Sequence, residues 1–246
     1  MSGADERPAS RGLSRTEASA AVEDLGWRYL IGLLCASVPV ASLGQASAVA
    51  AMAVAACGPD ADRHLRADLR PDRVELSLQD RAANGVTARD AELAAAISSA
   101  VAGLGAAIAP PDAAAYPRPV QVLELAIDAV DIPAIRPFWR AVLGYGDEPG
   151  TVELSTGEPD AAVVDPAGQG PAIWFQQMDA PRPQRNRIHF DITVAGAEGE
   201  ARVRAALAAG GTLVSDAAAP SFWVLADAEG NEACVCTWLE RDERGW

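Results

Sequence analysis

The sequence contains no lysine, and its 20 basic residues, all arginine, face 34 acidic residues, for a formal net charge of −14. Nucleic acid is disfavoured as a partner, because phosphate binding needs clustered positive charge. A small-molecule ligand is therefore expected. The use of arginine alone, together with abundant alanine, is typical of a GC-rich bacterial genome.

Cysteine is scarce, with four residues that show neither paired CxxC zinc spacing nor the density of a disulfide scaffold. Their number fits a reducing cytoplasm. The opening "MSGADERPASRG" lacks the apolar core of a signal peptide. The apolar stretch 29–57 is interrupted by Pro39, Gly44, Gln45 and serines, and its second half is mostly alanine, so we expect no membrane helix.

Prolines divide the chain at "GAAIAPPDAAAYPRPVQV", which cannot continue a helix and is typical of a linker. At 246 residues, the chain is long enough for two domains. We predict a disordered tail over 1–12, a first domain over 13–109, a linker over 110–119 and a second domain over 120–240.

The first domain is predicted to run helix, two strands, helix, strand, helix. Ser14 and Glu17 form a capping-box pattern that starts the first helix, and Thr87 with Asp90 starts the last one. Gly58 and Pro59 should end an alanine-rich helix over 44–57. The expected strands are "WRYLIGLL" (27–34), "CASVPVASL" (35–43) and "DRVELSL" (72–78), the last with strict alternation.

The first domain contains the stretches "LSRTEASAAVEDLGW" and "VELSLQDRAANGVTARDAELAAAI". In these stretches and in this order of elements, residues 13–105 resemble the pterin-4a-carbinolamine dehydratases. In that family a His-His-Pro loop and a third histidine bind the pterin and move protons. The matching positions here are Arg63-His64-Leu65 and Arg81. A guanidinium stays protonated and cannot act as a general base, so His64 alone would remain catalytic.

Three roles stay open for this domain. It could keep activity as a 4a-hydroxytetrahydropterin dehydratase through His64. It could bind an anionic or planar ligand with Arg63, His64 and Arg81, since arginine suits carboxylates and flat rings. It could also be an inactive dimerisation or docking module. The resemblance implies an exposed sheet edge and an apolar helix face, so we expect a homodimer.

The second domain contains an internal repeat. "VQVLELAI" (120–127), a helix over 132–144 and short strands at 151–155, 161–164 and 172–177 form one βαβββ unit. "RIHFDITV" (187–194), a helix over 197–211 and strands at 212–215, 222–227 and 232–238 form a second. The expected fold class is α+β, with an antiparallel sheet carrying helices on one face followed by this pair of repeats.

The second domain contains the stretches "FWRAVLGY", "NRIHFDI" and "LADAEGNEACV". In these stretches, residues 120–238 resemble the glyoxalase and bleomycin-resistance group, the vicinal-oxygen-chelate superfamily. In its metal-dependent members, side chains from the first and last strands of each repeat hold one divalent ion. The resemblance maps these positions to Glu124, His189 and Cys234, with Trp174 and Gln176 where the family has a carboxylate. It leaves iron, manganese, zinc and nickel unresolved.

The domain would then be a lyase, isomerase or oxygenase, with Glu124 as base or ligand and His189 as ligand or acid. The alternative is metal-free binding of an aromatic metabolite or antibiotic, in a pocket walled by Trp174, Gln176 and Trp223. Glu124 and His189 fall at equivalent places in the two repeats, so we expect them to share one site. Arginines at 182, 185 and 187 could attract an anionic ligand to its mouth, or simply be solvated.

Overall fold

The computed structural model describes residues 11–83, 85–109, 121–148, 162–181 and 188–244. The chain divides into two compact units, residues 1–122 and 123–246. Within the described ranges no helix combines the length and apolar character needed to cross a membrane. The predicted tail, linker, strand 151–155 and arginine loop lie largely or wholly outside these ranges.

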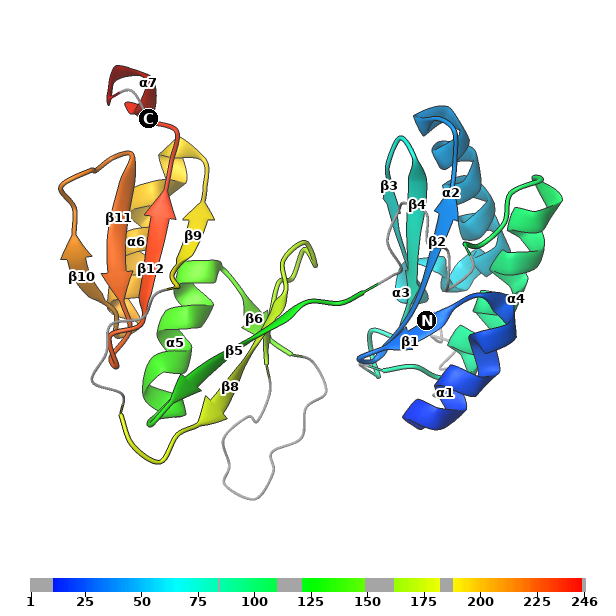
Figure 1. The fold of residues 1–246 in the computed structure, drawn as a ribbon, viewed down its shortest axis with the longest axis horizontal. Coiled ribbons are helices and arrows are strands. Elements are labelled where there is room, and N and C mark those ends of the chain that lie inside the picture. The colour runs from blue at the N-terminus through cyan, green and yellow to red at the C-terminus, as the bar shows by residue number, and fades with distance from the viewer. Residues whose placement is uncertain (1–10, 84, 110–120, 149–161, 182–187, 245–246) are drawn as a thin grey trace, which may run out of the picture. The chain divides into compact units, whose positions relative to one another are not determined.

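The N-terminal unit is an antiparallel sheet in the order β1-β2-β4-β3, with α1, α2 and α4 against one face (Figure 1). Its strands are β1 (Arg28–Leu30), β2 (Leu33–Pro39), β3 (Leu65–Leu69) and β4 (Arg73–Leu78). Its helices are α1 (Arg15–Val22), η1 (Glu23–Leu25), α2 (Leu43–Cys57), η2 (Gly58–Asp60), α3 (Ala61–His64) and α4 (Ala88–Gly103).

Local chemistry sets the ends of the helices in this unit. Both predicted capping boxes are present, with Ser14 at α1 and Thr87 at α4, and such caps contribute about 1 kcal/mol each. Helix α2 ends where Gly58 takes φ +56°, a conformation that side chains disfavour. The core lies between the sheet and the helices, and Val74, Leu76 and Leu78 of β4 are almost fully buried in it.

Two predicted features of this sheet were wrong. The first two strands turn at Ile31 and Gly32, both at positive φ, so β2 already begins at Leu33. The prediction also missed β3, because "LRADL" carries charges on the face away from the helices and reads as a loop. Among the described strands, β3 is an edge strand that pairs only with β4, and there exposed charge is tolerated.

The C-terminal unit contains the two predicted βαβββ repeats. The first consists of β5 (Glu124–Ala129), α5 (Ile132–Leu143), β6 (Gly146–Asp147), β7 (Val163–Val164) and β8 (Ala172–Gln177). The second consists of β9 (Phe190–Thr193), η3 (Gly196–Glu198), α6 (Gly199–Ala208), β10 (Thr212–Ser215), β11 (Phe222–Ala226) and β12 (Glu232–Cys236), followed by α7 (Arg241–Arg244). The expected α+β class is confirmed, while β6 was not predicted.

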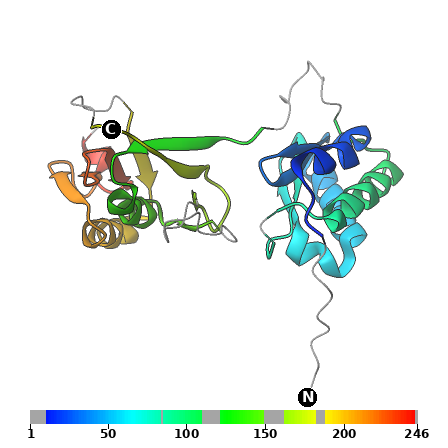
Figure 2. The ribbon, with the colours of Figure 1, turned by 90° about the horizontal axis from the view of Figure 1, so that it is seen from below.

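The two repeats have the same topology. Their sheets run β5-β8-β7-β6 and β9-β12-β11-β10, and in each the first strand pairs in parallel with the last. Helices α5 and α6 pack side by side, as Figure 2 shows in green and light brown. Arg202 of α6 donates from Nη1 to the carbonyl of Val142 near the end of α5, where a cation is favoured.

A buried carboxylate joins the repeats. Asp227, in the turn between β11 and β12, accepts a 2.9 Å hydrogen bond from Trp139 Nε1 of α5. The same carboxylate accepts the backbone N–H groups of Glu229 and Asn231 and the Asn231 side-chain amide. Glu229 in turn accepts the N–H groups that precede α5. The "DAEGN" turn therefore holds the start and middle of the first repeat's helix.

We predict that Trp139→Phe lowers the free energy of unfolding by about 2 kcal/mol, because it removes a hydrogen bond to a buried charged group. Urea denaturation followed by circular dichroism measures this. Trp238→Phe is the matched control, since Trp238 is 69% exposed and should change little. Equal midpoints for the two variants would show that the Trp139 contact does not hold the repeats together.

Candidate functional site

The strands of the C-terminal unit bury one face against α5 and α6 and leave the other open. Ile127, Ile173, Ala233 and Val235 belong to the core shared with these helices. Because side chains alternate along a strand, their neighbours in sequence point to the opposite face. The residues assigned to this open face are Glu124, Asp128, Trp174, Gln176, Asp191, Cys234 and Cys236.

Three possible metal ligands meet on the open face of the second sheet. One ligand atom each from His189, Asp191 and Cys234 lies within 4.8 Å of the others. Asp191 and Cys234 are direct partners in the parallel pairing of β9 with β12. His189 stands two residues before Asp191, and its Nε2 lies 3.3 Å from Asp191 Oδ1.

Burial differs sharply within this cluster. The side chains of His189 and Asp191 are 53% and 60% exposed, whereas Cys234 is 8% exposed. Burial, followed by the nearby Asp191 carboxylate, raises the pKa of the Cys234 thiol to about 12. Burial likewise raises the pKa of Cys236, which pairs with Thr193 instead of with a ligating residue.

The donor set fits a divalent ion. An imidazole nitrogen, a carboxylate oxygen and a sulfur are all zinc ligands, and tetrahedral coordination would space them about 3.5 Å apart. The ligand atoms, all within 4.8 Å of one another, therefore need only a small adjustment of the exposed His189 and Asp191 side chains. Three protein ligands leave a fourth position for water or substrate, as in catalytic zinc sites.

The structure brings together two of the three predicted metal ligands, His189 and Cys234, and adds Asp191. Glu124 begins β5 and pairs with Ala172, on the open-face phase of the first sheet. It is not a member of the cluster found among the described residues. A site shared by Glu124 and His189 stays a prediction.

The predicted aromatic wall is divided between two faces. Trp174 is 40% exposed and Gln176 is exposed, both on the open-face phase of β8. Trp223 is buried in the core, and its ring approaches Gly199 at the start of α6. The structure therefore places Trp223 on the helix side of its sheet, while its predicted role in ligand binding is untested.

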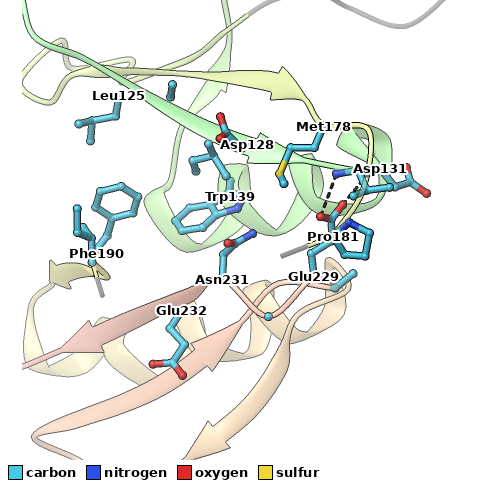
Figure 3. Close-up of a pocket in the computed structure, with 16 residues that line it drawn as sticks. Leu125, Asp128, Asp131, Trp139, Met178, Pro181, Phe190, Glu229, Asn231 and Glu232 are labelled. Atoms are coloured by element: carbon cyan, nitrogen blue, oxygen red, sulfur yellow. Dashed lines mark hydrogen bonds between the residues drawn. The ribbon is translucent and has the colours of Figure 1, made fainter. Parts of the chain in front are cut away.

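A cavity of about 800 Å³ lies between the two repeats. In Figure 3 Trp139 and Asn231 lie close together in its wall, with Leu125 and Phe190 to one side and Met178 and Pro181 to the other. Trp139 and Phe190 meet edge to face at 5.4 Å between ring centroids. Glu232 lines the cavity and lies two residues before Cys234 on β12.

In the N-terminal unit, His64 is buried at the end of α3 with one carboxylate partner. Its Nδ1 lies 2.8 Å from Oδ1 of Asp90, which is fully buried. The other oxygen of Asp90 accepts the backbone N–H and the hydroxyl of Thr87. Asp90, the third residue of α4 and part of its capping box, therefore also orients the His64 ring.

The two arginines predicted to bind a ligand have contacts within the protein. Arg63 donates from Nε and Nη2 to the two oxygens of Asp80, at 2.9 and 2.7 Å. Arg81 donates from Nη2 to the carbonyl of Leu65 at 3.0 Å and also to the carbonyl of Asp62. Both therefore brace the segment around His64, and their predicted role in ligand binding is untested.

Sequence reasoning missed Asp191, Trp139 and Asn231. Asp191 follows His189 by two residues, so strand alternation alone places both side chains on one face. That signal was available in "HFD". Trp139 and Asn231 line the cavity only because the turn before β12 returns to α5, a contact between residues far apart in the sequence.

Comparison with known proteins finds a family match within the C-terminal unit. Residues 124–236 match the family model described as a glyoxalase-like domain. No curated protein matches the chain.

Three solved structures illustrate the similarity, and each covers about half of this chain. A glyoxalase/bleomycin resistance protein/dioxygenase family enzyme from Burkholderia phytofirmans is 21% identical over 47% of this chain and 97% of that one, with a TM-score of 0.36. FosX, the fosfomycin resistance protein of Mesorhizobium loti, is 9% identical over 51% of this chain and 97% of that one, with a TM-score of 0.38. A mutant of FosX from Listeria monocytogenes, complexed with Mn(II), is 13% identical over 52% of this chain and 99% of that one, with a TM-score of 0.37.

The contact between Arg63 and Asp80 should make the stability of the fold depend on pH in the acidic range. Burial acts to raise the pKa of Asp80, but Arg63 and the backbone N–H groups of Ala83 and Ala82 lower it by more. A carboxyl whose pKa is lowered in the folded state stabilises the fold at every pH above its pKa in the unfolded chain, about 3.9. This stabilisation is lost as the pH falls through the lower pKa of the folded state. Asp80→Asn should therefore lower the unfolding temperature at pH 7. Below pH about 4, the unfolding temperature of this variant should fall less steeply with pH than that of the wild type.

Thermal unfolding at several pH values measures this effect. Asp216→Asn is the control, because Asp216 is an exposed acid in the other unit. A variant at Asp80 that keeps the wild-type profile at every pH would contradict the assignment.

Proposed function

Since residues 124–236 form a glyoxalase-like domain, we propose that this unit binds one divalent metal ion and uses it to hold an oxygen-bearing small molecule. The observation that carries the proposal is the convergence of His189, Asp191 and Cys234 within 4.8 Å on an open sheet face. Bound there, a metal ion would polarise an oxygen of the ligand.

Each ligand has a distinct part in this site. Cys234 is buried in a strand that is paired on both sides, so it provides a fixed anchor. His189 and Asp191 are exposed and can adjust to the ion. Because the cluster faces solvent, a ligand can reach the remaining coordination position directly. This combination supports turnover or reversible binding better than a closed structural site.

Glu124 is proposed as the general base or as a further ligand, with His189 as ligand or acid. What supports this role is its place at the start of β5, the strand equivalent to β9 in the other repeat. Trp174 and Gln176, on the paired strand, are proposed to contact the organic part of the ligand, because an exposed indole offers a flat apolar surface. The reaction class would be that of a lyase, isomerase or oxygenase.

The second candidate function is binding of an organic molecule without a metal. The cavity between the repeats supports it, since its volume of about 800 Å³ is typical of ligand pockets. Its walls include Trp139, Phe190 and Leu125, with Asn231 as a polar contact. In this function His189 and Asp191 would form only a surface ion pair.

Metal analysis separates the two functions. We predict about one divalent ion per chain in protein purified without chelator, by inductively coupled plasma mass spectrometry. His189→Ala and Asp191→Asn should each lower metal affinity about tenfold or more. Thr193→Ala is the matched control, because Thr193 lies on the same phase of β9 outside the cluster. Metal-free wild-type protein that also fails to take up Zn²⁺, Mn²⁺ or Fe²⁺ would leave only the second function.

For the N-terminal unit we propose a structural or docking role, with dimerisation as one form of it. The arginines in the positions of two family histidines are already engaged with Asp80 and with backbone carbonyls, which supports this role over catalysis. Homodimerisation stays a prediction. The exposed Leu43 and Val54 of α2, a helix without charged residues, are compatible with it.

We predict that the whole protein dehydrates a carbinolamine pterin at least about a hundredfold more slowly than a family member with three histidines. General acid–base groups typically contribute 10² to 10⁴ in rate, and only His64 remains here. Stopped-flow absorbance measures the rate, with His64→Ala as the matched variant. Turnover at the full family rate would show that the dehydratase chemistry is intact.

A further inference from the structure

The sulfur donor in the proposed metal site has a consequence for which ion is bound. We infer that the site selects a thiophilic ion of the zinc type, bound through the Cys234 thiolate, and supports Lewis-acid chemistry instead of oxygen activation. This inference rests on the proposed function and narrows it. It concerns Asp191 and Cys234, which come together from neighbouring strands of one repeat.

The strand register makes the thiol an unavoidable member of the cluster. Cys234 lies on β12, which is paired with β11 through Val224 and with β9 through Asp191. Pairing on both sides keeps the Cys234 side chain on this face of the sheet. An ion held by the exposed His189 and Asp191 would therefore lie next to the sulfur of Cys234, since all three ligand atoms fall within 4.8 Å.

The donor count argues against ions that prefer oxygen. Mg²⁺ and Ca²⁺ need about six or more oxygen ligands, and Mn²⁺ likewise favours carboxylate, carbonyl and water. The cluster offers one carboxylate, one imidazole and one sulfur. Zinc accepts all three types in a four-coordinate arrangement, and soft sulfur ligands favour it further.

Binding through Cys234 is balanced in charge and protons. The thiol hydrogen-bonds to Asp191, and when the metal–sulfur bond forms, the S–H bond breaks and its proton leaves to solvent. Thiolate and carboxylate then carry two negative charges against the two positive charges of the ion. Such a neutral centre attracts a carbonyl or hydroxyl oxygen without a strong preference for multiply charged anions.

The same donors restrict the reaction class. Zinc has no redox chemistry, so a site of this selectivity favours polarising a carbonyl or activating water. Isomerase, lyase or hydrolytic reactions on an oxygen-bearing metabolite are then favoured over oxygenase reactions.

Cobalt substitution tests the inference without any assay of activity. Co²⁺ added to the whole metal-free protein should produce a sulfur-to-cobalt charge-transfer band in the near ultraviolet, at one equivalent. Cys234→Ser should lose this band and bind Zn²⁺ at least about tenfold more weakly. Its Mn²⁺ affinity, measured by electron paramagnetic resonance, should change much less.

Cys236→Ser is the matched control. Cys236 is buried on the same strand and face, two residues away, but pairs with Thr193 and lies outside the cluster. It should keep the band and the Zn²⁺ affinity of the wild type. Because the band is sought first in the wild-type protein, a variant that fails to fold does not remove the test.

The outcomes separate this inference from the proposed function. Co²⁺ or Mn²⁺ binding without a sulfur band overturns the inference and leaves a metal site standing. A band that survives in Cys234→Ser but disappears in Cys236→Ser overturns it as well. Absence of binding by every ion overturns both. A band lost only in Cys234→Ser, with Zn²⁺ bound more tightly than Mn²⁺, supports both.

Discussion

The buried carboxylate of Asp227 is the contact on which the C-terminal unit depends. A buried charge is costly unless it is fully hydrogen-bonded, and Asp227 meets that condition with four donors. One of them, Trp139 Nε1, comes from the other repeat. The turn that orients β12 is therefore tied to α5, and the adjoining residue Glu229 binds the start of the same helix. Residues of this turn also line the cavity between the repeats.

Parallel pairing of β9 with β12 decides the composition of the proposed site. It places Asp191 beside Cys234, and alternation adds His189 to the same face. A slip of one residue would turn Cys234 toward the helices and bring Ala233 or Val235 to the open face, so the register and the chemistry are inseparable. The core contacts of Ala233 and Val235 fix that register from the other side of the sheet.

In the N-terminal unit, contacts within the protein order the segment around His64. Arg63 and Arg81 both stabilise the segment around His64, one through Asp80 and the other through backbone carbonyls. His64 itself is oriented by Asp90, which also belongs to the capping box of α4. A buried carboxylate with two such roles ties the ring to the helix start. The segment is thus well ordered by interactions that need no ligand.

The sequence by itself determined the elements that local chemistry controls. Capping boxes at Ser14 and Thr87, the glycine after α2 and the alternating strands were readable because each depends on residues a few positions apart. The repeat was readable for the same reason, and the resemblance to the vicinal-oxygen-chelate superfamily then pointed to the candidate residues His189 and Cys234. Tertiary structure alone decided that Asp191 completes their cluster, that Trp139 reaches Asp227, that Trp223 faces the core and that β3 pairs at a sheet edge. These outcomes depend on strand register and on contacts between distant residues, which local patterns do not specify.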